Sequence, residues 1–363
     1  MNKIAFILGT RPEILKLMPI IKEIPEEQRE IIWTGQHYSP ELAEAWWAEE
    51  GFKPDIECCY GDDDEERHPC NATNAMRLAE MIAEINAQIV GFSNLHWVVV
   101  QGDTDSALAG ALAAAKLNIP VFHVEAGSRS GDSIQPEEIN RKLIDHCASG
   151  WAAAYPWDMD NLQTEGIGHQ ASDNVIMSGD TLIDGLKEWE AKVNPKDMPG
   201  ESWNILATIH RAETLNNKQA LSEIFSFLDN LAMSTPVVLL AHPHLWQAAS
   251  DNLLAFADYK FQTRDALQPS EFRKALMYSK LFITDSGGAA TEAAYFGVPT
   301  IIARDNLELH DLENCGRIIL GGRTQESLSK AMLTVQSNAP LSLEVKQAWH
   351  GQAGKLIAER LLA

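Results

Sequence analysis

The chain has few cysteines and lacks a long apolar run. Its five cysteines, Cys58, Cys59, Cys70, Cys147 and Cys315, form no CxxC pair and no Cys/His cluster with metal-ligand spacing. Such an odd, scattered set argues against a disulfide framework and a structural zinc, and it suits a reducing cytoplasm. No run reaches membrane-spanning length, and no early segment has the pattern of a signal peptide. We therefore expect a soluble cytoplasmic protein with no metal site.

Basic residues are also scarce. The 29 Lys and Arg residues stand against 51 Asp and Glu, which gives a formal net charge of -22 over 363 residues. An acidic surface repels phosphate backbones, so we expect no nucleic acid partner. One acidic run, GDDDEE at 61–66, is interpreted as a solvated loop.

Short β-branched runs alternate with amphipathic stretches along almost the whole chain. This is the pattern of parallel sheets covered by helices. Strands are expected at 4–9, 31–35, 97–102, 120–125 and 151–155, and in a second series at 175–178, 204–210, 236–241, 260–263, 281–284 and 300–303. Helical periodicity is clearest at 104–117, 137–147, 218–233, 270–278 and 343–362. The sequence thus predicts an α/β fold of two Rossmann-like, doubly wound domains that face a central cleft.

The expected domain boundary is a glycine-rich polar stretch, GIGHQASD, at 166–173. We assign 1–172 to an N-terminal domain and 173–345 to a C-terminal domain. A C-terminal helix at 346–363 is expected to pack back on the N-terminal domain. Ligands of such folds bind at the carboxyl ends of the strands, so polar residues at those ends are the candidates for function.

The most informative segment lies at 279–302, SKLFITDSGGAATEAAYFGVPTII. An apolar strand ends at Asp285, and Ser286, Gly287 and Gly288 lead into a helix that carries Glu292. The glycines permit close backbone approach, and the N–H groups of a first helical turn attract an anion. With Glu292 placed to accept both ribose hydroxyls, a nucleoside diphosphate is the first hypothesis. The alternative is an ordinary strand-to-helix turn with a surface glutamate.

Cations follow two other predicted strands. GTRPEILK at 9–16 places Arg11 and Lys16 near a helix start, where they would add positive charge to an anion site or simply lie at the surface. This segment is neither GxGxxG nor a Walker loop, so it implies neither a dinucleotide nor ATP. His210 and Arg211, in ATIHRAET, are candidate phosphate ligands, whereas His146, on an otherwise apolar helix face, is interpreted as a core histidine.

Carboxylates also gather at predicted strand ends. Asp103 follows one strand and Glu125 the next, and PEEINR at 136–141 adds Glu137, Glu138 and Arg141 at a helix start. Crowding and burial separate the pKa values of neighbouring carboxyl groups, which suits acid/base chemistry. The alternative is that these groups only cap helices and pair with helix dipoles. The residues alone do not choose between Glu137 and Glu138.

Taken in order, these motifs resemble the UDP-N-acetylglucosamine 2-epimerase family, which has the glycosyltransferase B-type fold. The matching segments span nearly the whole chain: GTRPEILKLMP at 9–19, TGQHY at 34–38, QGDTDSALAGALAA at 101–114, IPVFHVEAGSRS at 119–130, PEEINRKLIDH at 136–146, HRAET at 210–214 and DSGGAATEAAYFGVPTI at 285–301.

The resemblance implies a role for each matching residue. The N-terminal domain becomes the sugar and catalytic side and the C-terminal domain the UDP-binding side. Residues assigned to catalysis are Asp103, Glu125, Glu137 and His210. Residues assigned to substrate binding are Arg11, Lys16, Glu138, Arg141, Arg211, Ser286, Gly287, Gly288 and Glu292, and no metal or cofactor is implied. The family reaction removes the proton at sugar carbon 2 as UDP leaves carbon 1, and then reverses both steps on the other face of the resulting glycal.

The chain departs from the family pattern in three places, and the first, on the nucleotide side, concerns the choice of sugar and base. RDNLELHD at 304–311 stands where RDTTERPE is usual, Thr291 replaces an acid, and Thr214 replaces an asparagine. The segment at 67–76 also matches poorly the region of an activator site in some members. The leading hypothesis is a non-hydrolysing epimerase that interconverts UDP-GlcNAc and UDP-ManNAc for polysaccharide biosynthesis. The alternatives are a hydrolysing epimerase, a glycosyltransferase and an inactive nucleotide-sugar sensor.

The resemblance also implies a homodimer built on the N-terminal half. Trp46 and Trp47, within an expected helix at 39–50, are either an exposed contact or part of that half's own core.

Overall fold

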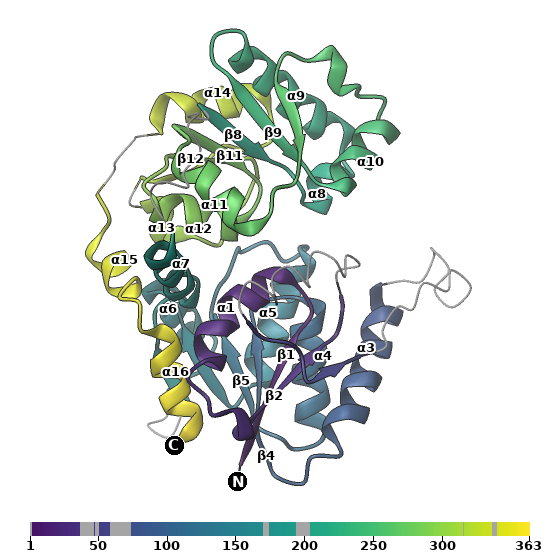
Figure 1. Ribbon diagram of the computed structural model, residues 1–363, viewed down its shortest axis with the longest axis vertical. Coiled ribbons are helices and arrows are strands. Elements are labelled where there is room, and N and C mark those ends of the chain that lie inside the picture. Colours follow the sequence, from purple (N-terminus) through teal and green to yellow (C-terminus); the bar gives the residue numbers. More distant parts are fainter. Residues whose placement is uncertain are drawn as a thin grey trace. The chain divides into compact units, whose positions relative to one another are not determined.

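The chain forms two compact units, each built on one parallel sheet (Figure 1). The first unit comprises Met1–Trp189 and Lys346–Ala363, and the second comprises Glu190–Val345. This computed structural model describes residues 2–36, 47, 51–58, 74–169, 174–193, 204–314, 316–335 and 340–363.

The sheet of the first unit has the order β3-β2-β1-β4-β5-β6-β7, and every neighbouring pair is parallel. Its strands are β1 (Lys3–Leu8), β2 (Arg29–Trp33), β3 (Ile56–Glu57), β4 (Leu95–Gln101), β5 (Val121–Val124), β6 (Gly150–Ala153) and β7 (Asn174–Met177). The central strands are apolar along their length because both faces of the sheet are covered. The connections reverse direction between β1 and β4, and ligands bind at such a switch point in doubly wound folds.

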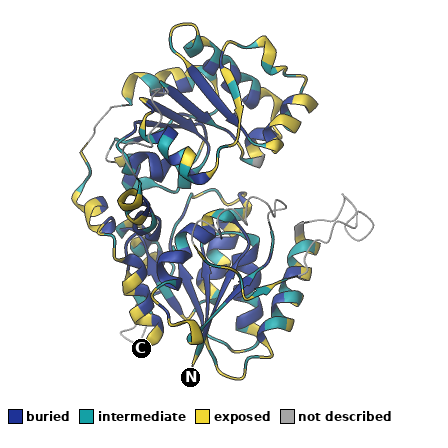
Figure 2. Ribbon diagram, in the orientation of Figure 1, coloured by how far each residue is buried: buried dark blue, intermediate teal, exposed yellow. Residues whose placement is uncertain are grey.

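Helices cover both faces of this sheet. They are α1 (Arg11–Ile21), η1 (Glu26–Gln28), α3 (Asn74–Ile89), α4 (Asp105–Lys116), α5 (Pro136–Cys147), α6 (Pro156–Thr164), α7 (Thr181–Lys192), α15 (Leu343–Ala348) and α16 (Ala353–Leu362). Ala5 and Ile7 of β1 belong to a core with α3 and α4, while Phe6 and Leu8, on the other face, are equally buried. Figure 2 shows this burial along the strands.

The predicted boundary between the domains differs from the observed division. The segment at 175–178 was assigned to the second series of strands, and that assignment is wrong because β7 pairs with β6 in the first sheet. The first unit therefore continues past the glycine-rich stretch and through most of α7. The described part of that stretch, 166–169, follows α6 within the first unit.

The second sheet repeats the same strand order. Its strands run β10-β9-β8-β11-β12-β13, all parallel, with the reversal between β8 and β11. Their bounds are β8 (Ile205–Thr208), β9 (Val237–Ala241), β10 (Gln262–Asp265), β11 (Leu281–Thr284), β12 (Thr300–Ile302) and β13 (Ile318–Leu320). Two apolar cores, one on each face, hold helices against this sheet. These helices are α8 (Ala212–Leu215), α9 (Lys218–Ala232), α10 (Pro243–Asp251), η3 (Phe256–Asp258), α11 (Pro269–Met277), α12 (Gly287–Tyr295), α13 (His310–Asn314) and α14 (Gln325–Thr334).

The C-terminal segment forms two helices where the sequence predicted one. Gly351 interrupts the helix with a φ of 80°, a left-handed conformation that glycine adopts without strain. The second helix, α16, packs against α1 (Figure 1). Gly354 permits this contact, because a Cβ atom there would lie 2.5 Å from the carbonyl oxygen of Pro19. The backbone N–H of Gly354 donates to the carboxylate of Asp184 at 2.8 Å.

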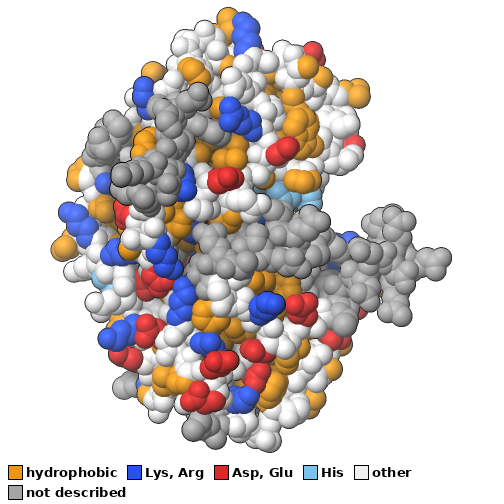
Figure 3. Space-filling model, in the orientation of Figure 1, with side chains coloured by type: hydrophobic (Ala, Val, Ile, Leu, Met, Phe, Trp, Pro, Cys, Tyr) orange, Lys and Arg blue, Asp and Glu red, His pale blue; other side chains and the backbone are white. Residues whose placement is uncertain are grey.

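Trp47 is buried and packs edge-to-face on Trp33, with ring centroids 5.6 Å apart. This contact agrees with the core-packing alternative for Trp47, while Trp46, GDDDEE and most of the segment at 67–76 lie outside the described residues. On the face drawn in Figure 3, the described acidic and basic side chains are interspersed. Within the described residues, no helix has both the length and the apolar character needed to span a bilayer.

Candidate active site

The carboxyl edge of the first sheet holds a cluster of paired charges. Because its strands are parallel, the residues that follow β1, β4, β5 and β7 share one edge. The structure brings together there most of the N-terminal residues assigned from the sequence. Those assigned residues are Arg11, Lys16, Asp103, Glu125, Glu137, Glu138 and Arg141.

Glu125 is the most constrained member of this cluster. It follows β5 directly and has a φ of 64°, a left-handed conformation that costs a non-glycine residue on the order of 1–3 kcal/mol. Lys16 donates to both of its carboxylate oxygens, at 2.6 and 2.8 Å, and the amide of Gln101 donates to one of them. Strain held at a charged residue on a strand end is typical of a functional site.

Burial sets the protonation of this pair. Desolvation raises the pKa of Glu125, and the positive charge of Lys16 opposes that rise. Burial alone would lower the pKa of Lys16, but the charges of Glu125 and Asp180 outweigh it and raise that pKa. Lys16 therefore stays protonated and positively charged, and it lies beside the Glu125 carboxylate, whose basicity is increased.

Asp180 is a member of this cluster that the sequence analysis missed. It is buried, it accepts the Tyr155 hydroxyl at 2.7 Å, and its pKa is raised by burial and lowered in turn by Lys16, with the rise prevailing. The same Tyr155 hydroxyl accepts the indole N–H of Trp349 at 2.8 Å, from the segment that returns to the first unit. The available signal was its position, three residues after the end of β7, much as Asp103 lies two residues after the end of β4.

A second charge chain joins β4 to α5. Arg141 forms an ion pair with Asp103 and, at 3.1 Å, with Glu138. Burial would raise the pKa of Glu138, but the backbone N–H of Ser130 and the charge of Arg141 outweigh it and lower that pKa. Glu138 is thus a structural anion that holds Arg141. Glu137, in the first turn of α5, is half-buried.

The start of α1 also contains a buried acid that the sequence analysis did not assign. One oxygen of Glu13 accepts the N–H groups of Gly9 and Thr10, and the other accepts the Thr104 hydroxyl at 2.7 Å. Burial raises the pKa of Glu13 to about 7. Thr104 caps α4, and Arg11, half-buried, begins α1. Glu13 therefore ties the end of β1 to the end of β4 across the switch point.

The carboxyl edge of the second sheet presents donors in place of carboxylates. Ser286 caps α12, and the helix begins at Gly287, so the two glycines predicted as a turn before the helix form its first turn. The buried carboxylate of Asp285 accepts the N–H groups of His210 and Arg211 at 2.9 to 3.1 Å. It thereby holds the exposed His210 side chain beside the end of β8.

Glu292 lies deeper than an exposed ribose ligand would. It is 7% exposed and forms an ion pair at 3.2 Å with Arg273, a buried residue of α11 that the sequence analysis missed. Burial raises the pKa of Glu292, and Arg273 opposes the rise. The pair fixes the carboxylate of Glu292 one to two turns into α12.

The unusual segment at 304–311 packs against the glycine turn. Buried Arg304 forms an ion pair with Glu308 at 3.1 Å and also donates to Asn306. A Cβ atom on Gly287 would lie 2.6 Å from Glu308, whereas a Cβ atom on Gly288 would meet nothing within 4 Å. A side chain at position 287 would therefore have to displace the Glu308 carboxylate from its place beside Arg304, whereas Gly288 leaves open space above the helix start.

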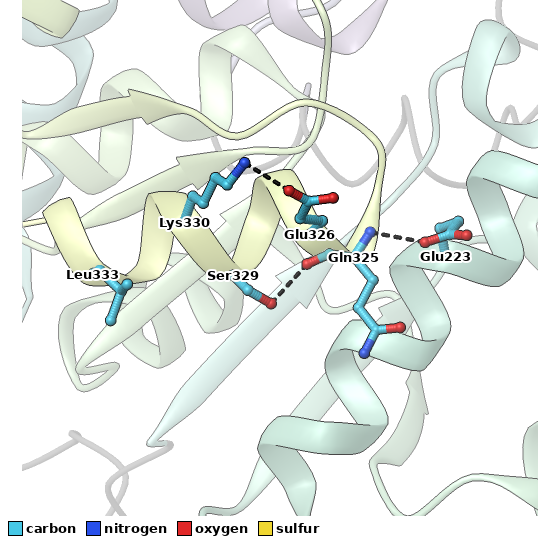
Figure 4. A pocket seen from close by; sticks show the side chains of 6 residues that line it. All are labelled: Glu223, Gln325, Glu326, Ser329, Lys330 and Leu333. Atoms are coloured by element: carbon cyan, nitrogen blue, oxygen red, sulfur yellow. Dashed lines mark hydrogen bonds and ion pairs between the residues drawn. The ribbon is translucent and has the colours of Figure 1, made fainter.

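None of the assigned residues lines the groove of about 510 Å³ between α9 and α14 (Figure 4). Glu223 of α9 accepts the backbone N–H of Gln325 there at 2.9 Å, and Glu326 pairs with Lys330. Within the described part of the chain, no group of three or more His, Cys, Asp or Glu residues is arranged to hold a metal ion.

A family model of UDP-N-acetylglucosamine 2-epimerase matches residues 20–362. The chain belongs to the UDP-N-acetylglucosamine 2-epimerase family. It is a nucleotide-sugar 2-epimerase, an isomerase that acts on carbohydrates. The resemblance found in its motifs is confirmed.

Two relatives show the breadth of this family. The chain is 32% identical to UDP-2,3-diacetamido-2,3-dideoxy-D-glucuronate 2-epimerase of Pseudomonas aeruginosa, over 99% of each chain. It is 33% identical to UDP-N-acetylglucosamine 2-epimerase of Methanocaldococcus jannaschii, over 99% of this chain and 98% of the relative.

Solved structures confirm the fold class. The Methanocaldococcus jannaschii epimerase in complex with UDP-GlcNAc and UDP superposes with a TM-score of 0.88 at 31% identity, covering 99% of each chain. A UDP-glucose:anthocyanidin 3-O-glucosyltransferase in complex with UDP shares the fold alone, with a TM-score of 0.57 at 9% identity, over 99% of this chain and 94% of that one. The epimerase therefore has two Rossmann-like domains of the glycosyltransferase B type.

His146 of this epimerase is not the core histidine that the sequence predicted. It is exposed, and its ring lies 3.7 Å from Glu165. Ile139 and Leu143, on the same face of α5 as His146, are about half exposed, whereas the buried face carries Ile144 and Asp145. Among the described residues, the fully buried histidine is His123 of β5.

Proposed function

We propose that this enzyme is a non-hydrolysing 2-epimerase of UDP-N-acetylglucosamine or a closely related 2-acetamido UDP-sugar. The observation that carries the proposal is the strained Glu125 held by Lys16, on the same sheet edge as Asp103 held by Arg141. Inversion at carbon 2 removes a proton from one face of the sugar and returns one to the other face, so it needs two proton carriers. Asp103 and Glu125 supply two, and Glu137 is the third candidate.

The reaction proceeds as an elimination followed by an addition. A carboxylate takes the carbon 2 proton while the bond between carbon 1 and the UDP oxygen breaks, and its electron pair leaves with UDP. The product is a glycal with a double bond between carbons 1 and 2. That carbon-bound proton is weakly acidic, so the increased basicity of Glu125 assists its removal.

UDP is a good leaving group only where its growing charge is stabilised. The first turn of α12, with Ser286 and Gly288, offers backbone N–H groups to an anion. His210 and Arg211, held by Asp285, add side chains that donate. Glu292, fixed by Arg273, is the proposed ribose ligand.

The relatives leave the sugar open. The substrates that their names give both carry UDP at carbon 1 and an acetamido group at carbon 2, and they differ at carbons 3 and 6. Elimination of UDP across carbons 1 and 2 is possible for both of these substrates. A hydrolysing enzyme would let water attack the intermediate and release free ManNAc and UDP.

Proton NMR of the sugar in heavy water tests the proposal. The protein is incubated without an acceptor, first with UDP-GlcNAc and then with UDP-2,3-diacetamido-glucuronate and other 2-acetamido UDP-sugars. We expect deuterium at carbon 2 of the intact UDP-sugar and interconversion of the gluco and manno forms. Accumulation of free ManNAc would support the hydrolysing alternative, and no deuterium with any sugar would reject the epimerase mechanism for this chain. The predicted homodimer stays a prediction, which light scattering at micromolar concentration tests.

A further inference from the structure

Beneath the catalytic edge lies a buried polar chain that the proposed mechanism does not use. His123 and Asp145 are both fully buried, and His123 Nδ1 lies 2.6 Å from Asp145 Oδ1. The other ring nitrogen, Nε2, lies 2.8 Å from the carbonyl oxygen of Gly102. Gly102 directly precedes Asp103, so the ring contacts the backbone that carries a proposed catalytic carboxylate.

Asp145 reaches a second catalytic segment as well. Its other oxygen accepts the N–H of Gly127 at 3.1 Å, two residues after Glu125. The same oxygen pairs with Arg129 at 2.8 Å. The buried carboxylate of Asp145 therefore holds two backbone segments. It accepts directly from the segment that follows Glu125, and it reaches the segment before Asp103 through the His123 ring.

Arg129 links this chain to a second carboxylate, that of Glu165. The charged groups that face the chain are Asp145 of α5, Arg129 after β5, Glu165 after α6 and, at the exposed end, His146. Arg129 donates to Glu165 through two nitrogens, at 2.8 and 2.6 Å. Asp145 is fully buried, whereas Glu165 is 24% exposed, so Arg129 and the His123 ring are the groups that contact the buried charge of Asp145.

The two hydrogen bonds of the His123 ring require it to donate from both nitrogens. Burial would raise the pKa of Asp145, but the neighbouring His123 and Arg129 outweigh it and lower that pKa, so Asp145 is an acceptor. A carbonyl oxygen is also an acceptor. Since both ring nitrogens of His123 face acceptors, both must donate, and only the imidazolium does so.

We propose that His123 is a positioning residue of the reaction, held as an imidazolium by Asp145, and that it fixes the Gly102 carbonyl and thereby sets the Asp103 carboxylate against Arg141. This inference rests on the proposed function in one respect, the participation of Asp103 in proton transfer. His123 itself touches no substrate; it acts through the backbone.

Two isosteric variants separate the two bonds of the ring. The amide nitrogen of glutamine in His123→Gln lies near the position of Nε2 and can still donate to Gly102. The amide nitrogen of asparagine in His123→Asn lies near Nδ1 and can donate only to Asp145. Both variants remove the buried positive charge of the His123 ring, so we expect them to lose a similar amount of stability. His146→Gln, an exposed change at the rim of the same chain, is the matched control.

We expect His123→Asn to lower kcat by about a hundredfold while the affinity for UDP changes little, because a misplacement of about 1 Å has that effect on a catalytic group. His123→Gln should stay within about tenfold of the parent, and His146→Gln should equal it. Equal losses of kcat in His123→Gln and His123→Asn would show that His123 contributes only to stability, and would overturn the proposal.

Nitrogen-15 NMR of the ring gives a readout that needs no turnover. A doubly protonated ring has two similar nitrogen shifts, whereas a neutral ring has two widely separated ones. We expect two similar shifts for His123, because both of its ring nitrogens face acceptors, with the signals assigned by their loss in His123→Gln. If the parent exchanges no carbon 2 proton with any sugar, the proposed function fails, and these shifts alone decide the positioning claim: a neutral ring overturns it.

Discussion

The carboxyl edge of the first sheet presents carboxylates with their paired cations, whereas the same edge of the second sheet presents backbone N–H groups, a histidine and an arginine. Yet the two sheets run through the same order of strands. In the first unit, Glu125 and Asp103 are held by Lys16 and Arg141. In the second, a carboxylate at the equivalent place, Asp285, is turned inward to hold the backbone of its neighbours.

This difference teaches that the fold fixes where chemistry occurs and the side chains fix which chemistry it is. An edge with buried acids of shifted pKa suits the transfer of protons. An edge with a capped glycine turn suits an anion. We therefore expect damage to the first edge to affect turnover, and damage to the second to affect nucleotide affinity.

The largest expected effect is on turnover at the first edge. Glu125→Gln and Asp103→Asn keep the shape of each side chain but remove a proton carrier, so kcat should fall by about a hundredfold or more while UDP still binds. Steady-state kinetics and a UDP titration measure the two quantities. Glu27→Gln, an exposed change in the same unit, is the control. Turnover near the parental rate in both edge variants would place the proton carriers elsewhere.

The next effect is on stability, and it depends on pH. The pKa of Glu13 is about 7 in the folded protein and near 4.5 in the unfolded chain, so folding binds a proton between these values. The stability that Glu13 contributes is therefore greatest at low pH and is lost as the pH rises through about 7. Relative to Glu13→Gln, the parent should lose about 2 kcal/mol of unfolding free energy from pH 5 to pH 8.

Urea unfolding of the parent and Glu13→Gln at several pH values measures this difference. A difference between the two proteins that stays constant with pH would show that Glu13 is ionised throughout. Glu26→Gln, at an exposed first-unit carboxylate, should leave the pH dependence of the parent unchanged.

A smaller effect is expected at the second edge, where two adjacent glycines separate packing from binding. Gly288→Ala has open space in the protein but places a methyl group at the helix start, so it should weaken UDP binding about tenfold without lowering the melting temperature. Gly287→Ala would push against Glu308 and should lower the melting temperature itself. Thermal shifts with and without UDP distinguish the two. Unchanged UDP affinity in Gly288→Ala would remove the nucleotide from this helix start.

The smallest effect is expected in the groove of Figure 4. Lys330 pairs with Glu326 at 2.7 Å, but both side chains are largely exposed, and exposed pairs contribute little to stability. Lys330→Ala should leave melting temperature, UDP affinity and turnover within experimental error. A loss of UDP affinity in this variant would extend the binding surface to α14.

Much of this architecture could be predicted from the sequence, because parallel strands covered on both faces are continuous apolar runs. The helices at α4, α5, α9 and α11 were predicted to within a residue or so. The assignment of β7 was wrong because its pairing partner is decided by long-range contacts that no local pattern records. The break before α16 falls at Gly351, where the φ is 80° and a Cβ atom would lie 2.6 Å from Lys187, so it too depends on a tertiary contact.

The candidate site likewise contains residues that could be predicted from the sequence and residues that could not. Residues at strand ends, such as Asp103 and Glu125, could be found because the position itself is the signal. Arg273, which reaches Glu292 from another helix, could not, because only packing brings the two together. His123 was missed since its alternation within β5 is that of any buried strand residue.

The central claim is that proton transfer belongs to the first edge and nucleotide binding to the second. The most direct test measures deuterium incorporation at carbon 2, per molecule of bound UDP-sugar, in Glu125→Gln and Gly288→Ala. We predict that Glu125→Gln binds the sugar nucleotide with parental affinity but exchanges at least about a hundredfold more slowly. Gly288→Ala should bind about tenfold more weakly yet exchange at close to the parental rate once saturated. Parental exchange in saturated Glu125→Gln, or a loss of exchange in saturated Gly288→Ala, would contradict the account.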